Sequence, residues 1–304
     1  MIAKTNTEHY QNIANEIREA NDYAVFKSEI EVDNELFEDI GEAVAEKDGE
    51  EVPKKSELVE RIGRLSNSPL IFEQIVNRTA TGTIISDKVS HLLPAMFDEM
   101  TTVIGIILNR NPLFIGGYPV GRTAHQCFNG CTALKYVILP HLADELPDAS
   151  GRNSLGNYVF NRCNNLKLVI LNTMGKSPEG RVFLDANNII NLIISNNVII
   201  PLTNTNTFIN SAISSGTCNI YIPDILKENY KAATNWSTYA SQFKGYSEAP
   251  DYNINTIYTI GDVCKYNNKL YAWINETDSN SKPIGDIDEY NDWYCVANIE
   301  EVEI

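Results

Sequence analysis

The first 65 residues carry apolar side chains at helical spacing. Positions i, i+3, i+4 and i+7 are apolar or small between Tyr10 and Ile17, and the same pattern returns between Phe37 and Val44. A third such segment runs from Ser56, a candidate N-cap, to about residue 65. Helices this short are marginally stable alone, so we expect them to pack on each other or on a partner chain.

A more regular pattern occupies the middle of the chain. Counting from a phenylalanine, apolar or small residues recur at +3, +6, +9 and +11 in units that start at residues 97, 128, 160 and 183. The +9 and +11 residues alternate, which predicts a short strand with one face inward. One unit cannot bury that face alone, so we expect the units to stack around a continuous core. The predicted core includes Phe97, Phe128, Cys131, Leu134, Phe160, Cys163, Leu166, Phe183 and Ile189.

The last part of the chain has a different character. Residues 246–304 contain seven Tyr, two Trp and no Phe. Tyr and Trp combine a large ring with a polar group, which suits them to recognition surfaces. Apolar segments predict strands over 256–259, 262–266 and 269–274. We expect Asn267 and Asn268 to form a tight hairpin turn between the last two strands.

Charge also divides the 304 residues into three parts. Residues 1–70 hold 17 acidic and 8 basic side chains, residues 71–244 hold 11 and 13, and residues 245–304 hold 12 and 3. We therefore expect domains over 1–68, 69–245 and 246–304. The net charge of −16 argues against broad nucleic-acid binding, which needs clustered Lys and Arg. No apolar run reaches the roughly 18 residues of a membrane span, and the N-terminus lacks the apolar core of a signal peptide.

Two segments resemble modules of known families. The run from Phe37 to Leu65 resembles a short module found near the ends of phage tail and baseplate proteins. The pattern F-x-x-C-x-x-L-x-x-V-x-L-P, which starts at Phe128, resembles the BspA-like leucine-rich repeat, over residues from about 80 to 245. The segment from Asn219 onward resembles the strand-plus-helix cap that closes such arrays. This resemblance implies that Trp236 and Tyr239 cover the last unit.

The aromatic C-terminal segment resembles the small chitin-binding type carbohydrate module of family 5/12. The matching residues are Tyr258, Gly261, Asp262, Val263, Tyr266, Lys269, Tyr271, Pro283 and Trp293. The resemblance implies sugar binding, in which flat aromatic rings stack on the C–H faces of pyranose rings. The candidate binding residues are Tyr271, Trp273, Trp293 and Tyr294. The alternative is that Tyr258, Tyr266 and Trp293 form the core of a small domain.

Chemistry-bearing motifs point away from catalysis. The chain has no GxxxxGK[ST], GxGxxG, HExxH or GxSxG motif, and its four histidines lack ligand spacing. Cys131 and Cys163 share one inward position of the repeat, where a cysteine packs as a small apolar residue. His125, Cys127 and Cys131 cluster in sequence, but no second pair completes a zinc site. We expect no enzyme activity, no cofactor and no metal, and we leave Ca²⁺ binding open.

These observations lead to one main interpretation. We expect a multidomain α+β fold of short N-terminal helices, an irregular leucine-rich-repeat solenoid and a small C-terminal all-β module. We expect a virion protein of a phage tail or tail-like particle, made in the host cytoplasm, that binds host cell-surface glycans. Residues 1–68 would contact other tail or baseplate subunits, and we expect a homo-oligomer, with a trimer as one option. The alternatives are a structural baseplate component whose C-terminal aromatics form subunit interfaces, a bacterial leucine-rich-repeat surface adhesin, or an accessory subunit of a glycan hydrolase.

Overall fold

The computed structural model describes residues 78–86, 89, 91–92, 95–109, 113–115, 125–142, 154–172, 177–286 and 289–299. The helices predicted for residues 1–68 lie outside these residues. None of the helices in the described residues is long and apolar enough to cross a membrane.

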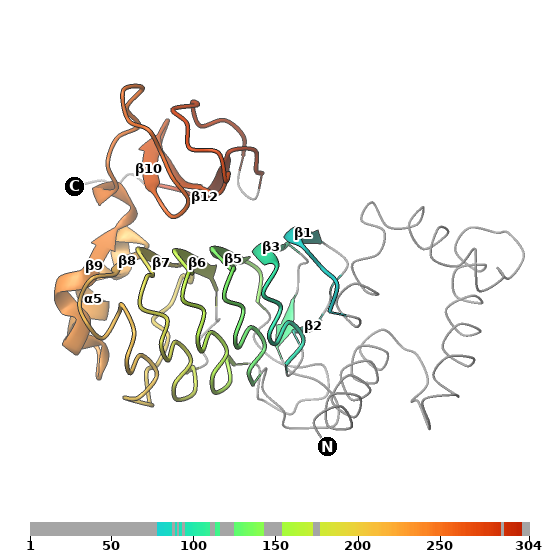
Figure 1. The fold of residues 1–304 in the computed structure, drawn as a ribbon. Helices are drawn as coiled ribbons and strands as arrows, with labels where there is room; N and C mark the ends of the chain where they lie inside the picture. The colour runs from blue at the N-terminus through green and yellow to red at the C-terminus, as the bar shows by residue number, and fades with distance from the viewer. Residues whose placement is uncertain are drawn as a thin grey trace, which may run out of the picture.

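Seven strands form one parallel sheet, and their order in the sheet follows their order in the chain. Figure 1 shows them side by side beneath the C-terminal strands β10 and β12. A separate parallel pair, β2 (His91–Leu92) and β4 (Phe114–Ile115), lies apart from this sheet. The seven strands are β1 (Gly82–Ser86), β3 (Val103–Leu108), β5 (Tyr136–Leu139), β6 (Leu168–Leu171), β7 (Asn191–Ile194), β8 (Asn219–Ile222) and β9 (Phe243–Gly245).

The recurring positions of the sequence lie in register across the sheet. Val137 pairs with Val169, and Val169 pairs with Leu192. The phenylalanines that start the units stack ring on ring, with centroids 5.1 Å apart between Phe97 and Phe128 and 5.3 Å apart between Phe128 and Phe160. The row continues through Phe183 to Phe208. The inner face of the sheet is therefore buried by side chains from the turns that connect its own strands.

A repeated backbone geometry holds the first four phenylalanines of this row. The residues two before and two after each of them have a positive φ, as at Gln126 (58°) and Gly130 (70°) around Phe128. A left-handed conformation costs a residue other than glycine about 1–2 kcal/mol. Hydrogen bonds between successive turns offset this cost, since the amide of Phe128 donates to the carbonyl of Val159 at 2.9 Å. Short-range strain is thus tolerated because neighbouring turns satisfy each other's backbone groups.

The last turn of the stack is covered by short helices. The segments η1 (Asp224–Leu226), α5 (Lys227–Ala232) and η2 (Trp236–Gln242) follow β8. The rings of Trp236 and Tyr239 both contact Phe208, with centroids 5.5 Å and 5.2 Å away. These two aromatic residues cover the end of the stack as predicted, but they do so at Phe208, which belongs to a further unit that the sequence pattern did not identify.

The C-terminal residues form a small antiparallel sheet. It contains β10 (Val263–Tyr266), β11 (Lys269–Trp273) and β12 (Trp293–Asn298), preceded by the short helix η3 (Tyr246–Glu248). Asn267 and Asn268 both have positive φ, as a two-residue hairpin turn requires, so the predicted hairpin is confirmed. The strand predicted over 256–259 is wrong, because Tyr258 makes only an isolated bridge with Ser279.

The predicted fold class is also wrong. We expected an α+β protein with an irregular leucine-rich-repeat solenoid. The described residues instead form a seven-stranded parallel sheet with few, short helices, an arrangement closer to α/β, and a small antiparallel sheet. The physical reason is that β5, β6 and β7 are buried along their whole length. Strands buried on both faces make the sheet a middle layer, whereas the sequence pattern predicted strands with one face inward.

Candidate functional site

The four residues predicted to bind carbohydrate are buried. The exposed fraction is 3% for Tyr271, 0% for Trp273, 1% for Trp293 and 0% for Tyr294. Trp273 and Trp293 face each other across β11 and β12, with ring centroids 4.9 Å apart at 87°. The indole N–H of Trp273 donates to the carbonyl of Asn275, and that of Trp293 donates to the carbonyl of Ser281. The prediction that these four rings form a stacking platform for sugars is therefore corrected: they are the core of the module.

The residues assigned to the core of the repeat are also buried. All nine are at most 2% exposed. The thiol of Cys131 donates to the carbonyl of Phe97 at 2.8 Å, and the thiol of Cys163 donates to the carbonyl of Phe128 at 3.0 Å. Burial raises the pKa of Cys131 to about 12 and raises the pKa of Cys163 well above its usual value. Protonated, buried thiols are poor nucleophiles and poor metal ligands.

Metal binding finds no support in the described residues. No group of three or more His, Cys, Asp or Glu side chains is placed to hold an ion in the part of the chain that the structure describes. His125 hydrogen-bonds through Nδ1 with the amide of Asn157 and lies 3.6 Å from Glu179, so it belongs to a link between turns.

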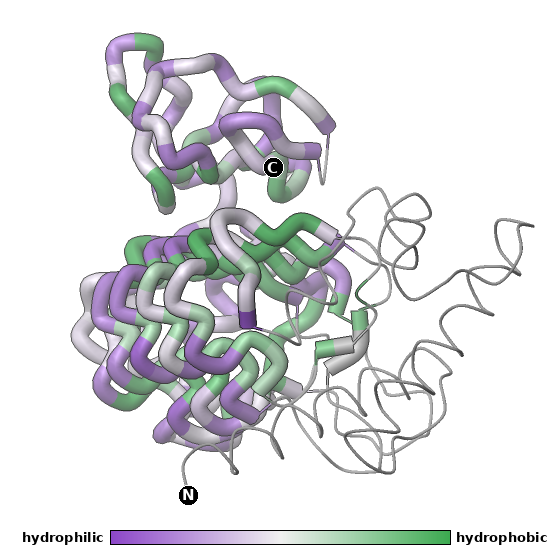
Figure 2. Tube along the Cα trace, turned by 45° about the vertical axis from the view of Figure 1, so that its right-hand side comes forward, coloured by the Kyte–Doolittle hydropathy of each residue, from purple (hydrophilic) through white to green (hydrophobic). Residues whose placement is uncertain are grey.

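The outer face of the seven-stranded sheet is covered by the C-terminal module. Side chains that point away from the inner core belong to one hydrophobic cluster with module residues such as Tyr258 and Trp273. Figure 2 shows hydrophobic segments along the side of the stack that faces the module. The sheet residues in this cluster are Ile107, Tyr136, Ile138, Leu168, Ile170, Ile193 and Tyr221. We did not predict this contact, although the apolar runs YVIL and LVIL are typical of strands buried on both faces.

Polar contacts fix the position of the module on the sheet. The side-chain amide of Asn191 donates to the carbonyl of Gly261 at 2.6 Å, and that of Asn219 donates to Asn191 Oδ1 at 2.9 Å. The hydroxyl of Tyr246 donates to the carbonyl of Ile194 at 2.9 Å. These bonds are largely shielded from water, so leaving one partner unpaired would cost about 1–3 kcal/mol.

Gly261 is required at this contact for two reasons. Its φ is +101°, which residues with a side chain rarely adopt. A Cβ at this position would also lie 2.9 Å from Cβ of Lys167, which lies just before β6. The backbone of the module therefore approaches the sheet as closely as a glycine allows.

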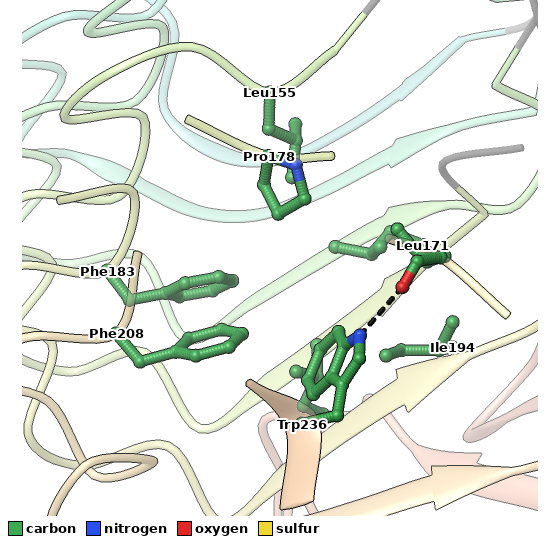
Figure 3. Close-up of a pocket in the computed structure, with 9 residues that line it drawn as sticks. Leu155, Leu171, Pro178, Phe183, Ile194, Phe208 and Trp236 are labelled. Carbon is green, nitrogen blue, oxygen red and sulfur yellow. Dashed lines mark hydrogen bonds between the residues drawn. The ribbon is translucent and has the colours of Figure 1, made fainter. Parts of the chain in front are cut away.

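The apolar cavity drawn in Figure 3 is too small for a sugar. Its volume is about 20 Å³, which is roughly the space of one water molecule. The indole N–H of Trp236 donates to the carbonyl of Ile200 at 2.7 Å and leaves no polar group for a ligand. The lining residues are Leu155, Leu171, Pro178, Phe183, Leu192, Ile194, Ile200, Phe208 and Trp236. The cavity is a packing defect at the covered end of the phenylalanine row.

Two half-buried tyrosines of the C-terminal module, Tyr252 and Tyr266, form what we call the tyrosine pair. Their ring centroids lie 5.7 Å apart at 76°. Tyr252 also stacks on the buried Tyr258 at 5.9 Å, and its hydroxyl donates to the carbonyl of Asn280. The ammonium of Lys282 lies 4.8 Å from the centre of the Tyr266 ring. A hydrogen bond with Tyr266 raises the pKa of Lys282, so this side chain is a cation at neutral pH.

Sequence reasoning missed the tyrosine pair. Tyr266 was assigned to the core as one alternative, and Tyr252 lies outside the residues that match the carbohydrate module. Alternation along β10 puts Tyr266 on the same face as Cys264, which is buried. The useful signal is instead the position of Tyr266 at the end of its strand, directly before the Asn267 turn, where a side chain reaches solvent.

Comparison of the chain with protein-family models, with curated proteins and with solved structures gives no match. The functional argument therefore depends on the geometry described above.

Proposed function

We propose that this chain is a non-enzymatic binding protein of a phage tail or tail-like particle, and that its C-terminal module contacts glycans on the surface of the host cell. The observation that carries the proposal is the fixed position of this module. It packs on the outer face of the parallel sheet through a hydrophobic cluster and buried hydrogen bonds, with the tyrosine pair left at the surface.

A fixed module suits recognition for an energetic reason. Binding by a mobile domain costs the entropy of ordering that domain, and a module already held in place avoids this cost. Single sugar sites bind weakly, but several copies on one particle raise the effective affinity by orders of magnitude. Attachment through residues 1–68 and assembly into a homo-oligomer are part of the proposal and concern residues outside those described.

The alternative of a purely structural baseplate subunit now requires different interface residues. We expected that a purely structural subunit would use the C-terminal aromatics at subunit interfaces. Trp273 and Trp293 are buried inside the chain itself, so an interface would need other residues. The surface-adhesin alternative differs from the main proposal in location, which is tested by searching purified particles for the chain.

The glycan part of the proposal is tested with the full chain on purified cell walls of candidate hosts. The isolated module is unsuitable, because its core is shared with the sheet. We expect the chain to sediment with walls of the true host. The matched control is the same wall after periodate oxidation, which cleaves the vicinal diols of sugars and should abolish binding. Binding that survives oxidation, or no binding to any wall, would contradict a glycan receptor.

A further inference from the structure

We propose that the tyrosine pair, together with Lys282, is the sugar-binding site of this chain, and that its ligand is a neutral pyranose unit of a polysaccharide. This inference rests on the proposed function and assigns the proposed glycan binding to particular residues. Of the described aromatic residues of the module, six are buried, and those that reach solvent are Tyr252, Tyr266 and Tyr290. Tyr290 bridges to Tyr294 beside β12, at the edge of the small sheet opposite β10, so it stands apart from the pair.

The rings of the tyrosine pair are held in place before any ligand arrives. Tyr252 is supported by its stack on Tyr258 and by the hydrogen bond from its hydroxyl to Asn280. The amide of Asn253 in turn donates to the hydroxyl of Tyr258 at 2.8 Å, which fixes the supporting ring. Tyr266 is supported by its edge contact with Tyr252. Rings already fixed lose little entropy on binding, which makes them efficient contact surfaces.

The surroundings of the pair combine apolar area with hydrogen-bonding groups. Ile254 and Ile257 are 65% and 59% exposed on the loop that connects Tyr252 to Tyr258. Lys282 is exposed, carries an ammonium with three donors, and contacts the ring of Tyr266. Apolar faces next to a few hydroxyl-binding donors match the two kinds of surface on a pyranose ring. A protein ligand would also suit exposed isoleucines, and this becomes an outcome of the test.

Charge selects a neutral sugar over an anionic polymer. Residues 245–304 hold 12 acidic and 3 basic side chains, and the whole chain has a net charge of −16. A polyanion such as a phosphate-rich wall polymer would be repelled over distances of about 8–10 Å at ordinary salt. Lys282 therefore serves as a donor to sugar hydroxyls.

The test uses the full chain in native gels that contain dextran, galactomannan or glycol chitin, with the wall pull-down run in parallel. We expect at least one neutral polysaccharide to retard the wild type. Tyr252→Ala and Tyr266→Ala should each weaken the apparent affinity by at least about tenfold, because each removes a large apolar contact. Tyr290→Ala, the matched tyrosine outside the pair, should leave the affinity unchanged.

The outcomes separate the site from the function. If the wild type binds and both alanine variants bind equally well, the site is wrong and glycan binding stands. If the wild type binds neither the polysaccharides nor periodate-sensitive walls, the proposed function fails, and binding to oxidised walls would indicate a protein receptor. Should either alanine variant fail to fold by circular dichroism, Lys282→Ala decides, since this side chain is exposed and the variant keeps both rings of the tyrosine pair. An unchanged affinity in that variant would overturn the proposed site.

Discussion

The two faces of the seven-stranded sheet are buried by residues from very different distances along the chain. The inner face is covered by turns that are close in sequence, and the thiol of Cys131 bonds to Phe97, 34 residues earlier. The outer face is covered by the C-terminal module, and Asn191 bonds to Gly261, 70 residues later. The inner contacts repeat from turn to turn, and the outer contacts are each made once. A repeated contact leaves a periodic signal in the sequence, and a contact made once leaves none.

The largest effect is expected from breaking the inner face at its centre. Phe160→Ala removes a ring that stacks between Phe128 and Phe183, and a buried Phe→Ala change costs about 3–5 kcal/mol. Since β6 has buried residues on both faces, we expect the stacked turns and the C-terminal module of this variant to unfold together in one cooperative step in denaturant. Val198→Ala, at a residue that is 55% exposed, is the control and should change the unfolding free energy little. Separate unfolding of the module and the sheet in the Phe160 variant would contradict this view of the sheet as a shared middle layer.

A smaller effect is expected from breaking the outer face alone. Gly261→Ala combines an unfavourable φ with a close contact to Lys167, and we expect a loss of about 2–4 kcal/mol. Hydrogen exchange should become faster in β10 and β11 before it does so in the turns that carry the phenylalanine row.

Gly216→Ala provides a matched control for that change. Gly216 also has a positive φ, of 78°, but a Cβ there would meet no atom within 4 Å. Gly216→Ala should therefore lower the free energy of unfolding only by the cost of a left-handed backbone conformation, about 1–2 kcal/mol. Equal losses in the two variants would show that the tight approach at Gly261 contributes nothing to docking.

The smallest effect concerns the link between the helices that cover the stack and the start of the module. A hydrogen bond from Lys227 lowers the pKa of Glu248 from its usual 4.5, and the amide of Gly245 also donates to this carboxylate. A lowered folded-state pKa stabilises the protein above pH 4.5, and this contribution disappears as the pH falls through the lowered pKa. For a half-exposed group it is at most about 1 kcal/mol.

The measurement is the unfolding free energy of the wild type and of Glu248→Gln between pH 7 and pH 3. We expect the wild type to be more stable at pH 7 and the two to converge at low pH. Glu228→Gln removes an exposed pair with Lys231 and should give a smaller difference. A constant difference across this pH range would mean that the carboxylate charge is not what stabilises the link.

Periodicity predicted local features well and missed one unit of the row. The hairpin at Asn267 and Asn268 follows from its turn residues, whereas the ring contacts of Trp236 and Tyr239 were implied by the resemblance to a capping segment. Phe208 was missed because the spacing in its unit is longer. Its strand residue that pairs with Leu192 is Ile220, 12 positions after Phe208, whereas the corresponding strand residue in the other units lies 9 positions after the phenylalanine. Hydrogen-bonded serine turns, such as the one from Ser211 to Phe208, occupy part of this longer connection.

The candidate site was harder to predict than the fold elements. Trp273 and Trp293 are of the residue type that forms sugar-binding platforms, yet a small antiparallel sheet also needs large rings in its interior. Which aromatic residues are internal depends on strand pairing and on what covers each face, and neither is encoded in residue type. The exposure of Tyr252 and Tyr266 became visible only once the loops around Asn280 and Lys282 were placed beside them.

By itself, the sequence determined the spacing of the stacked turns, the identity of the inward-facing phenylalanines and cysteines, and the hairpin of the C-terminal module. These features arise from contacts between residues close in the chain or repeated at a fixed interval. Only the tertiary structure decided that the sheet is buried on both faces, that Gly261 must approach Lys167, and that the tryptophans are internal. Those outcomes depend on contacts made once between distant segments, whose free energy comes from the fit of particular surfaces.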